Sequence, residues 1–260
     1  MYGIDLPLQK HDPDIQNVPL LATSPTFFSS IRSTYYDSCF PWDASASFFV
    51  QIQHYTYYPI MLVARFNLYA LSWQHILFSL PAIRNRKIRT TPTSTFWVVY
   101  LELACMAVYW YIHVSIIFSM PTWPQRVFFV LISHGISMLL HIQITLSHFG
   151  MSTADLGPTE SFAQKQLRTT MDVDCPAWLD WLHGGLQFQV VHHLFPRMPK
   201  HNYREAQKLV KEFCADTGIK YTIYGFVEGN KVVIGRLEEV AKQVGLLVKC
   251  QQHLVEECFQ

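Results

Sequence analysis

The sequence has few charged residues and no marked excess of either sign. Only 15% of its 260 residues are Asp, Glu, Lys or Arg, against roughly 25% in soluble domains. The formal net charge is +1, so no nucleic-acid partner is expected. Internal repeats and low-complexity tracts are also missing, which argues against a solenoid or another repeat array.

Paired cysteines are absent as well. The chain has six cysteines: Cys39, Cys105, Cys175, Cys214, Cys250 and Cys258. None of them belongs to a CxxC pair, and no secretory signal peptide follows Met1. We therefore expect a reducing, cytosol-facing environment rather than a disulfide framework or a structural zinc site.

What the sequence does contain is apolar bulk, because half of its residues are hydrophobic and 15% are aromatic. Two apolar segments, 96–120 and 127–148, each supply about the 20 residues that a bilayer core requires. Only residues 121–126 separate them, so we expect a tight membrane hairpin with its turn on the lumenal side. The basic run at 84–89 precedes the hairpin and predicts a cytoplasmic loop.

Ionisable residues inside the hairpin are informative because they are costly in hydrocarbon. Counted from the turn, His113 is about as deep as His134, and Glu102 lies within about one helical turn of His141. His134, His141 and His148 recur every seven residues along a stripe of roughly 20 Å, too long for one compact metal site. We predict that His148, at the cytoplasmic end, is the metal ligand and that the other two are packing or polar-rung residues.

The sequence predicts three parts. Residues 1–46 are a cytosolic or interfacial segment, and 47–199 form the membrane domain, whose aromatic but polar stretch 48–80 predicts interfacial helices. Residues 200–260 are expected to be a small cytosolic appendage.

The appendage is predicted to mix helices with an extended stretch. An amphipathic helix over 203–217 should end at Gly218, and a second helix should cover 233–248. Residues 221–227 read as extended, and Gly229–Asn230 reads as a turn.

The chemistry is concentrated in WLDWLHGGLQFQVVHHLFPRMP, residues 178–199. On a helix, positions i, i+3 and i+4 share a face, so Gln189, His192 and His193 can point into the same space. Two imidazoles and a carboxamide are ligands of the kind that helical di-iron sites take from each helix. Adjacent histidines are also found on hydrogen-bonded surfaces, but the surrounding apolar side chains would make unpaired imidazoles costly here.

Two aspartates precede this stretch. Asp172 and Asp174 could form a catalytic carboxylate pair. They could equally cap a helix that begins near Pro176. The sequence alone leaves both interpretations open.

With the spans placed, the sequence resembles the membrane fatty-acyl desaturases, and more narrowly the front-end desaturases that carry a fused cytochrome b5 domain. QVVHH at 189–193 matches the third histidine box of that group, in which Gln stands where other desaturases have His. Further matches are HIQITLSHFGMSTADLG at 141–157, LRTTMDVDCP at 167–176, QHYTYYPIMLVARFNLYALSW at 53–73 and HDPDIQNVPLL at 11–21. The resemblance covers essentially the whole chain and is nearest to the fungal sphingolipid Δ8 desaturases.

The resemblance implies a mainly α, integral membrane desaturase fold: a helical hairpin, interfacial helices, a cytosolic helical metal-site cap and a small α/β appendage. It implies an O₂-dependent reaction with two non-haem irons and electrons from cytochrome b5 and its reductase. The expected product is a ceramide with a double bond at C8–C9 of its long-chain base. The expected location is the endoplasmic reticulum membrane, multi-pass, with both ends cytosolic. The implied metal ligands are His148, Gln189, His192 and His193.

The sequence also departs from the family pattern. The earlier boxes HxxxH and HxxHH, and the HPGG motif of the haem domain, occur nowhere in it. Two irons need roughly eight or more protein ligands, more than the four candidates supply. We therefore expect the C-terminal portion of a desaturase, which binds iron poorly and is inactive alone. Two alternatives stay open: a front-end fatty-acyl desaturase or lipid hydroxylase with the same site, and a non-enzymatic membrane fragment or regulatory partner.

Overall fold

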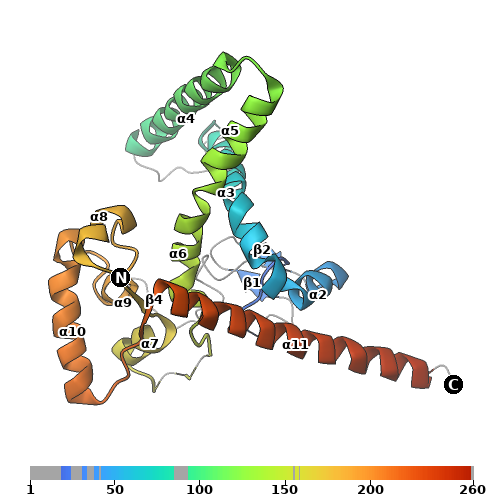
Figure 1. Ribbon diagram of the computed structural model, residues 1–260, viewed down its shortest axis with the longest axis vertical. Helices are drawn as coiled ribbons and strands as arrows, with labels where there is room; N and C mark the ends of the chain where they lie inside the picture. Colours follow the sequence, from blue (N-terminus) through green and yellow to red (C-terminus); the bar gives the residue numbers. More distant parts are fainter. Residues whose placement is uncertain are drawn as a thin grey trace. The chain divides into compact units, whose positions relative to one another are not determined.

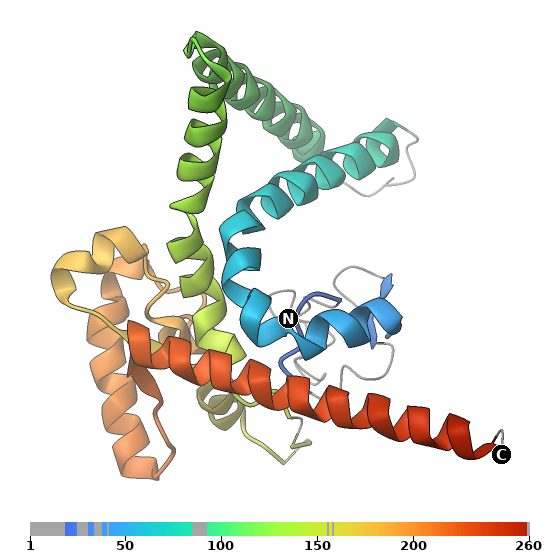
Figure 2. The same cartoon turned by 45° about the vertical axis from the view of Figure 1, so that its right-hand side comes forward.

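A computed structural model describes residues 19–24, 31–33, 38–40, 42–84, 93–154, 156–157 and 159–258. These residues are mostly helical, in agreement with the predicted class (Figures 1 and 2). The chain divides into two compact units, one of residues 1–57 with 142–260 and one of residues 58–141, and each is described by itself. The HDPD stretch at 11–14 and residues 85–89 of the basic run lie outside the described residues.

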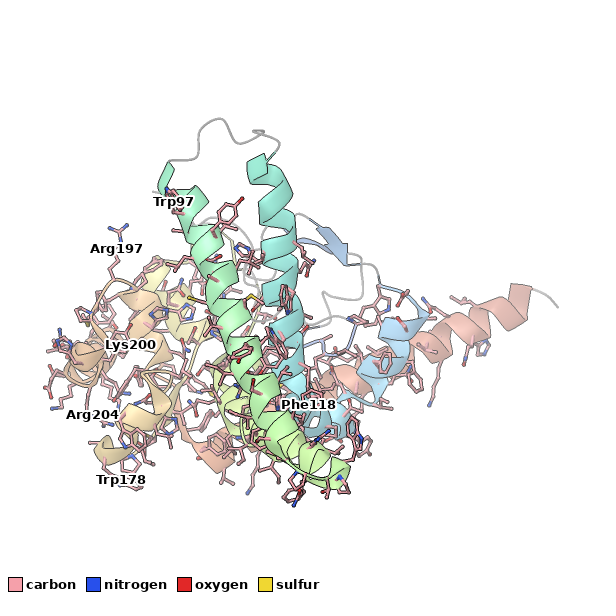
Figure 3. The ribbon with its side chains drawn as sticks, turned by 90° about the horizontal axis from the view of Figure 1, so that it is seen from above. Trp97, Phe118, Trp178, Arg197, Lys200 and Arg204 are labelled. Atoms are coloured by element: carbon pink, nitrogen blue, oxygen red, sulfur yellow. The ribbon has the colours of Figure 1, made fainter. Side chains whose placement is uncertain are left out.

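The unit of residues 58–141 contains the turn of the predicted hairpin, its first segment and most of its second segment. Helix α4 (Thr93–Ser119) ends just before a short turn, and α5 (Trp123–Gly135) follows it (Figure 1). Trp97 and Phe118 mark the two ends of α4 in Figure 3. The helix start is encoded locally, because Thr122 N donates to Gln125 Oε1 at 3.3 Å and a proline occupies the first turn, where its missing N–H is not needed. Two stretches, Trp97–Ser119 and Trp123–Phe149, are long and apolar enough to cross a membrane.

The second of these stretches contains a break that the sequence did not predict. Helix α5 ends at Gly135, and α6 (Met138–Phe149) begins after two turn residues. Ser137 Oγ donates to His134 O at 2.5 Å. The serine side chain thus bonds a backbone carbonyl that would accept a backbone N–H in a continuous helix. Glycine is also a weak helix former, which lowers the cost of the interruption.

The aromatic stretch before the hairpin forms two helices. The first, α2 (Ala44–Gln51), starts where the Asp43 carboxylate accepts a hydrogen bond from Ala46 N at 2.8 Å. The second, α3 (Gln53–Arg84), continues from one unit into the other. Its first residue, Gln53, is fully buried and bonds the backbone of Ala22 and the carbonyl of Leu237. This carboxamide ties the start of α3 to segments far away in the sequence.

The remaining elements belong to the unit of residues 1–57 and 142–260. They are β1 (Ile31–Ser33), β2 (Ser38–Phe40), α7 (Phe162–Thr169), β3 (Asp172–Asp174), η3 (Ala177–Leu179), α8 (Asp180–His183), α9 (Gln189–Leu194), η4 (Lys200–Asn202), α10 (Tyr203–Thr217), β4 (Ile223–Gly225) and α11 (Phe226–Cys258). Strands β1 and β2 are antiparallel. Strands β3 and β4 are parallel, with Val173 opposite Tyr224. Two apolar clusters form the core, one between α2 and α11 and one among α7, α9 and α10.

The C-terminal predictions are confirmed in part. Helix α10 covers the predicted residues 203–217 and ends at Gly218, whose φ of 71° is the left-handed conformation that glycine adopts readily. The turn predicted at Gly229–Asn230 is wrong, because both residues lie inside α11. A Cβ at Gly229 would lie 3.3 Å from side-chain atoms of Leu146 and Met171, so the glycine permits close packing. Residues 200–258 belong to the same compact unit as 142–199.

Cysteine side chains are reduced where the structure describes them. Cys105, Cys175, Cys214 and Cys250 are free thiols. Cys175 and Cys214 are buried, and burial raises the pKa of both thiols above the usual value. Their thiolate fraction at neutral pH is therefore small, as for packing residues.

Candidate functional site

The helix that carries the histidine pair is short and is held from outside. Helix α9 follows Gly184 and Gly185, whose φ values of 58° and 92° allow the chain to turn sharply after α8. The N–H groups in the first turn of a helix have no acceptor within the helix. In α9, the N–H of Val190 donates instead to Asp172 Oδ1 at 2.8 Å. Asp172 therefore caps α9, which is neither of the two roles that the sequence left open for it.

The Asp172 carboxylate is fully buried and collects two further donors. Gln207 Nε2 donates to Oδ2 at 2.8 Å, and the Tyr221 hydroxyl donates to the same oxygen. Burial raises the pKa of Asp172 above its usual value. Burial and the Asp172 charge together raise the pKa of Tyr221, so its hydroxyl keeps its proton and remains a donor. Through this one side chain, α9 is fixed to α10 and to the segment before β4.

The structure brings the rings of His148 and His193 together in an edge-to-face arrangement. His148 is buried near the end of α6, with 3% of its surface exposed, and its ring centroid lies 5.0 Å from that of His193. Burial, assisted by the neighbouring imidazoles of His148 and His192, lowers the pKa of His193 to about 3. His193 is therefore neutral at pH 7, which is the form that binds a metal ion.

The other two predicted ligands lie on the same short helix. His192 is exposed, its ring centroid is 5.8 Å from that of His193, and its Nδ1 is 3.1 Å from the Tyr203 hydroxyl. Gln189 is buried and stands four positions before His193, on the same side of the helix. Sequence patterns do not identify Tyr203 as a neighbour of His192, because no motif links it to a histidine eleven positions earlier.

These four candidate ligands do not amount to a complete two-iron centre. Within the described part of the chain, no group of three or more His, Cys, Asp or Glu side chains is placed to hold a metal ion. The converging pair is His148 and His193, while the His192 ring is directed to a tyrosine. The residues present fit one side of a metal site.

His134, one of the two histidines predicted to be packing or polar-rung residues, packs against aromatic rings. The rings of His113 and His134 lie 5.5 Å apart, which confirms the matched rung predicted from their depth. His134 Nδ1 is 2.8 Å from Val130 O, and its ring stacks on Phe66 at 4.7 Å. Glu102 lies 3.8 Å from His75, a neighbour that the depth argument did not identify.

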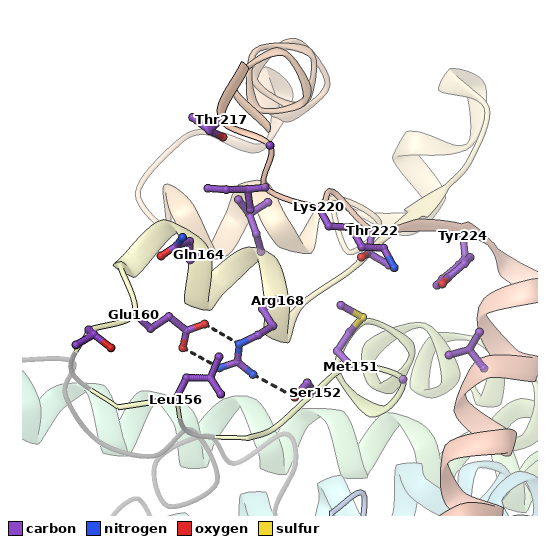
Figure 4. A pocket seen from close by; sticks show the side chains of 16 residues that line it. Met151, Ser152, Leu156, Glu160, Gln164, Arg168, Thr217, Lys220, Thr222 and Tyr224 are labelled. Atoms are coloured by element: carbon purple, nitrogen blue, oxygen red, sulfur yellow. Dashed lines mark hydrogen bonds and ion pairs between the residues drawn. The ribbon is translucent and has the colours of Figure 1, made fainter. Parts of the chain in front are cut away.

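A cavity of about 700 Å³ lies near α7, and one of its cations, Arg168, is already engaged (Figure 4). Arg168 donates to both carboxylate oxygens of Glu160, at 2.6 and 2.8 Å. It also donates to Ser152 Oγ at 3.1 Å and to Ala154 O at 2.8 Å. Arg168 thus fastens the loop after α6 to α7, and we assign it a structural role.

Comparison with known proteins gives the family. The model of the fatty acid desaturases matches residues 9–225. A Δ8-(E)-sphingolipid desaturase of Emericella nidulans is 50% identical over 250 residues, 95% of this chain and 44% of the relative. One of Kluyveromyces lactis is 51% identical over 249 residues, 95% of this chain and 42% of the relative.

A more distant plant relative agrees. A Δ8 fatty-acid desaturase of Helianthus annuus is 38% identical over 252 residues, 96% of this chain and 52% of the relative. The chain thus spans about half the length, or less, of these curated relatives, and no solved structure matches it significantly. The resemblance predicted from the QVVHH box and its flanking segments is confirmed, and the chain belongs to the fatty acid desaturase family.

Proposed function

We propose that this chain forms the part of a membrane sphingolipid Δ8 desaturase that carries the third histidine box. Identity of about half over nearly the whole chain, with relatives that bear this name, supports the assignment. The main observation in support of this assignment is the pairing of His148 with His193. His148 is a buried imidazole on the second apolar stretch, and His193 belongs to the QVVHH box.

The proposed reaction removes one hydrogen from each of C8 and C9 of the long-chain base of a ceramide. One O₂, two electrons and two protons complete the balance and leave two waters, and the electrons come from cytochrome b5 and its reductase. A methylene offers no polar group to recognise, so selectivity must come from position along an apolar channel. The apolar spans and the family assignment support a location in the endoplasmic reticulum membrane, with both ends in the cytosol.

We assign His148, Gln189, His192 and His193 as metal ligands of the complete enzyme. A carboxamide is a weak ligand, so Gln189 binds either directly or through a water. The hydroxyl of Tyr203 holds Nδ1 of His192 and leaves Nε2 as its ligand atom. Because four donors are too few for two irons, the chain by itself should hold less than two equivalents of iron.

The test is a chimera with the Emericella nidulans relative. The stretch of that enzyme that aligns with this chain is replaced by this chain, and the chimera is expressed in a host that makes no Δ8-unsaturated long-chain base. We expect the Δ8 product to appear, and His148→Ala or His193→Ala to abolish it. Altered fatty acids with an unchanged long-chain base profile would instead support an acyl-lipid desaturase. A folded chimera with neither change would contradict both enzyme assignments.

Metal analysis of the purified chain tests separately whether its ligands suffice for two irons. We expect well under two irons per chain after anaerobic loading. Two tightly bound equivalents would show that these residues build a complete centre, and our assignment of a partial site would then be wrong.

A further inference from the structure

The cavity of about 700 Å³ near α7 has the dimensions of a ligand site, since small-molecule sites occupy roughly 300–1,000 Å³. Its walls come from the loop after α6, from α7, from residues 217–224 and from the start of α11, all in one compact unit. The charges of Arg168 and Glu160 cancel each other. The other polar groups of the lining therefore decide what the cavity can bind.

One wall of the cavity is an extended segment that presents polar side chains at alternate positions. Lys220, Thr222 and Tyr224 all line the cavity, and Figure 4 shows them in a row. Side chains two positions apart on an extended chain point to the same side. The intervening Tyr221 points the other way and donates to Asp172. The segment thus has one side fixed to the core and one side open to the cavity.

The three side chains on the open side are available to a ligand. None of them has a hydrogen-bond or ion-pair partner among the residues that the structure describes. Lys220 is exposed and Tyr224 is half-buried. The Oγ1 atom of Thr222, unlike those of Thr23 and Thr170, is not fully enclosed by protein, so a molecule in the cavity can reach it. This wall offers one ammonium group and two hydroxyls that water or a ligand must satisfy.

The rest of the lining is largely aliphatic. Apolar side chains come from the loop after α6, from α7, from the segment before β4 and from α11: Met151, Leu156, Leu167, Ile219 and Val232. Leu167 is 1% exposed and belongs to the same apolar cluster as Val190 and Val191 of the QVVHH box. A cavity with polar groups along one wall and aliphatic groups along the others fits an amphiphile with a small polar head.

The cavity also begins beside a predicted metal ligand. The backbone N–H of Met151, a lining residue, donates to His148 O at 3.1 Å. An extended chain advances roughly 3.5 Å for every three bonds, so the seven bonds between C1 and C8 of a long-chain base span about 8 Å. A polar head held one helical turn beyond His148 is thus at a suitable distance for C8 to reach the His148–His193 pair.

We propose that this cavity binds the polar head of the ceramide substrate, with its two hydroxyls and its amide. Lys220, Thr222 and Tyr224 form hydrogen bonds to the head, and the aliphatic lining receives the first carbons of the chain. The inference rests on the proposed function and adds the residues from which the position of the double bond is measured. Methylenes cannot supply such a reference point, because they are all alike.

The first experiment measures binding by calorimetry, with the full purified chain in a neutral detergent. The probe is N-hexanoyl ceramide, and the comparison lipids are dioctanoylglycerol, which has no amide, and N-hexanoyl ceramide 1-phosphate. The test variant is Thr222→Val with Tyr224→Phe, which removes both hydroxyls and keeps the side-chain shapes. Lys220→Gln is matched by Lys231→Gln, another exposed lysine that lies outside the cavity. Melting temperatures show whether each variant is folded.

We expect N-hexanoyl ceramide to bind more tightly than dioctanoylglycerol. The double variant should weaken ceramide binding about tenfold, since each neutral hydrogen bond contributes a factor of about two to ten. Lys220→Gln should also weaken it, while Lys231→Gln changes little. An unchanged double variant, or equal affinity for the two neutral lipids, would overturn the proposal. Tighter binding of the 1-phosphate would overturn it in favour of an anionic lipid.

The chimera described above separates this inference from the proposed function. In membranes of the expressing host, the double variant should raise the KM for ceramide severalfold, with a smaller effect on kcat. Formation of the Δ8 product with an unchanged KM would contradict the head site alone. A chimera that forms no product, although the purified chain binds ceramide as expected, would contradict the proposed function alone.

Discussion

Asp172 Oδ1 and Val190 N, eighteen residues apart, are joined by a buried hydrogen bond of 2.8 Å. The bond connects strand β3 to the first turn of the helix that carries His192 and His193. Because α9 has only six residues, its own backbone bonds cannot hold it in place. Its position relative to α6 therefore depends on this carboxylate.

We predict that Asp172→Asn destabilises the fold and disturbs the histidine pair. The new NH₂ group would face the donors of Gln207 and Tyr221, and a buried donor without an acceptor costs about 1–3 kcal/mol. Thermal and denaturant unfolding of the purified chain in detergent measures the loss. The control is Asp174→Asn in the same strand, which is exposed and should shift stability by less than about 0.5 kcal/mol. Equal effects of the two variants would remove the special role of Asp172.

Two glycines of α11 should respond in opposite directions to a side chain. Gly229→Leu would force new atoms against Leu146 and Met171, and overpacking of this kind costs about 1–3 kcal/mol. A Cβ at Gly235 meets nothing within 4 Å, so Gly235→Ala should stabilise the helix by up to about 1 kcal/mol. Unfolding curves of both variants decide the matter. A destabilised Gly235→Ala variant would count against the described path of α11.

Tyr203→Phe should lower activity without unfolding the protein. The ring would keep its contact with Phe188, at 6.3 Å between centroids, but His192 would lose its partner at Nδ1. Loss of a group that orients a ligand histidine typically costs about 10–100-fold in metal affinity or activity. The Δ8 product of the chimera described above is the readout, with its melting temperature as the control. An unaltered yield would make Tyr203 a packing residue.

A contrast between two buried histidines separates ligation from packing. His148→Gln in the chimera should abolish the Δ8 product, because a carboxamide is a poor substitute for an imidazole ligand. His134→Gln should leave most of the product, since that ring stacks on Phe66 and bonds a backbone carbonyl. Lipid analysis after expression at equal protein levels measures both. Similar losses from the two substitutions would contradict the separate roles.

The Asp180–Arg204 pair predicts how stability depends on pH. Hydrogen bonding to Arg204 lowers the pKa of Asp180 below its usual value of 3.8. A carboxyl whose pKa is lower in the folded state contributes stability above its unfolded pKa and loses that contribution as the pH falls through the folded pKa. The wild-type melting temperature should therefore decline more steeply below about pH 4 than that of Asp180→Asn, which lacks this group. Parallel curves between about pH 6 and pH 3 would show that the pair adds nothing.

Local patterns predicted the elements that local interactions determine. Helix α10 was placed at 203–217 because its apolar period is clear and Gly218 ends it. The hairpin turn follows from the length of two apolar segments and from the proline-bearing residues between them. The sequence predicts His148 as the ligand because it is expected at the cytoplasmic end of its span, and in the structure its ring lies beside that of His193. Its role as a ligand remains a prediction.

Long-range packing decided what the sequence patterns missed. Gly229–Asn230 has turn chemistry, yet both residues lie inside α11, where the missing Cβ of Gly229 leaves room for the side chains of Leu146 and Met171. The donors to Asp172 come from positions up to forty-nine residues away, so no short motif contains them. The break at Ile136–Ser137 depends on a serine that bonds one carbonyl of the preceding turn, and many serines in helices do not do this.

The parallel pairing of β3 with β4 sets an order of events during synthesis. Residues 189–193 leave the ribosome before Gln207, Tyr221 and strand β4, which is the last element of the stretch matched by the family model. At roughly 5–20 residues per second, the histidine box waits for seconds without the groups that fix it. The contacts that hold the newborn helix through Asp172 are complete only once Tyr221 has arrived, and the pairing of β3 with β4 only once residue 225 has arrived. The arrangement of His148 beside His193 is therefore completed late, and its timing depends on a segment that lies outside the histidine box.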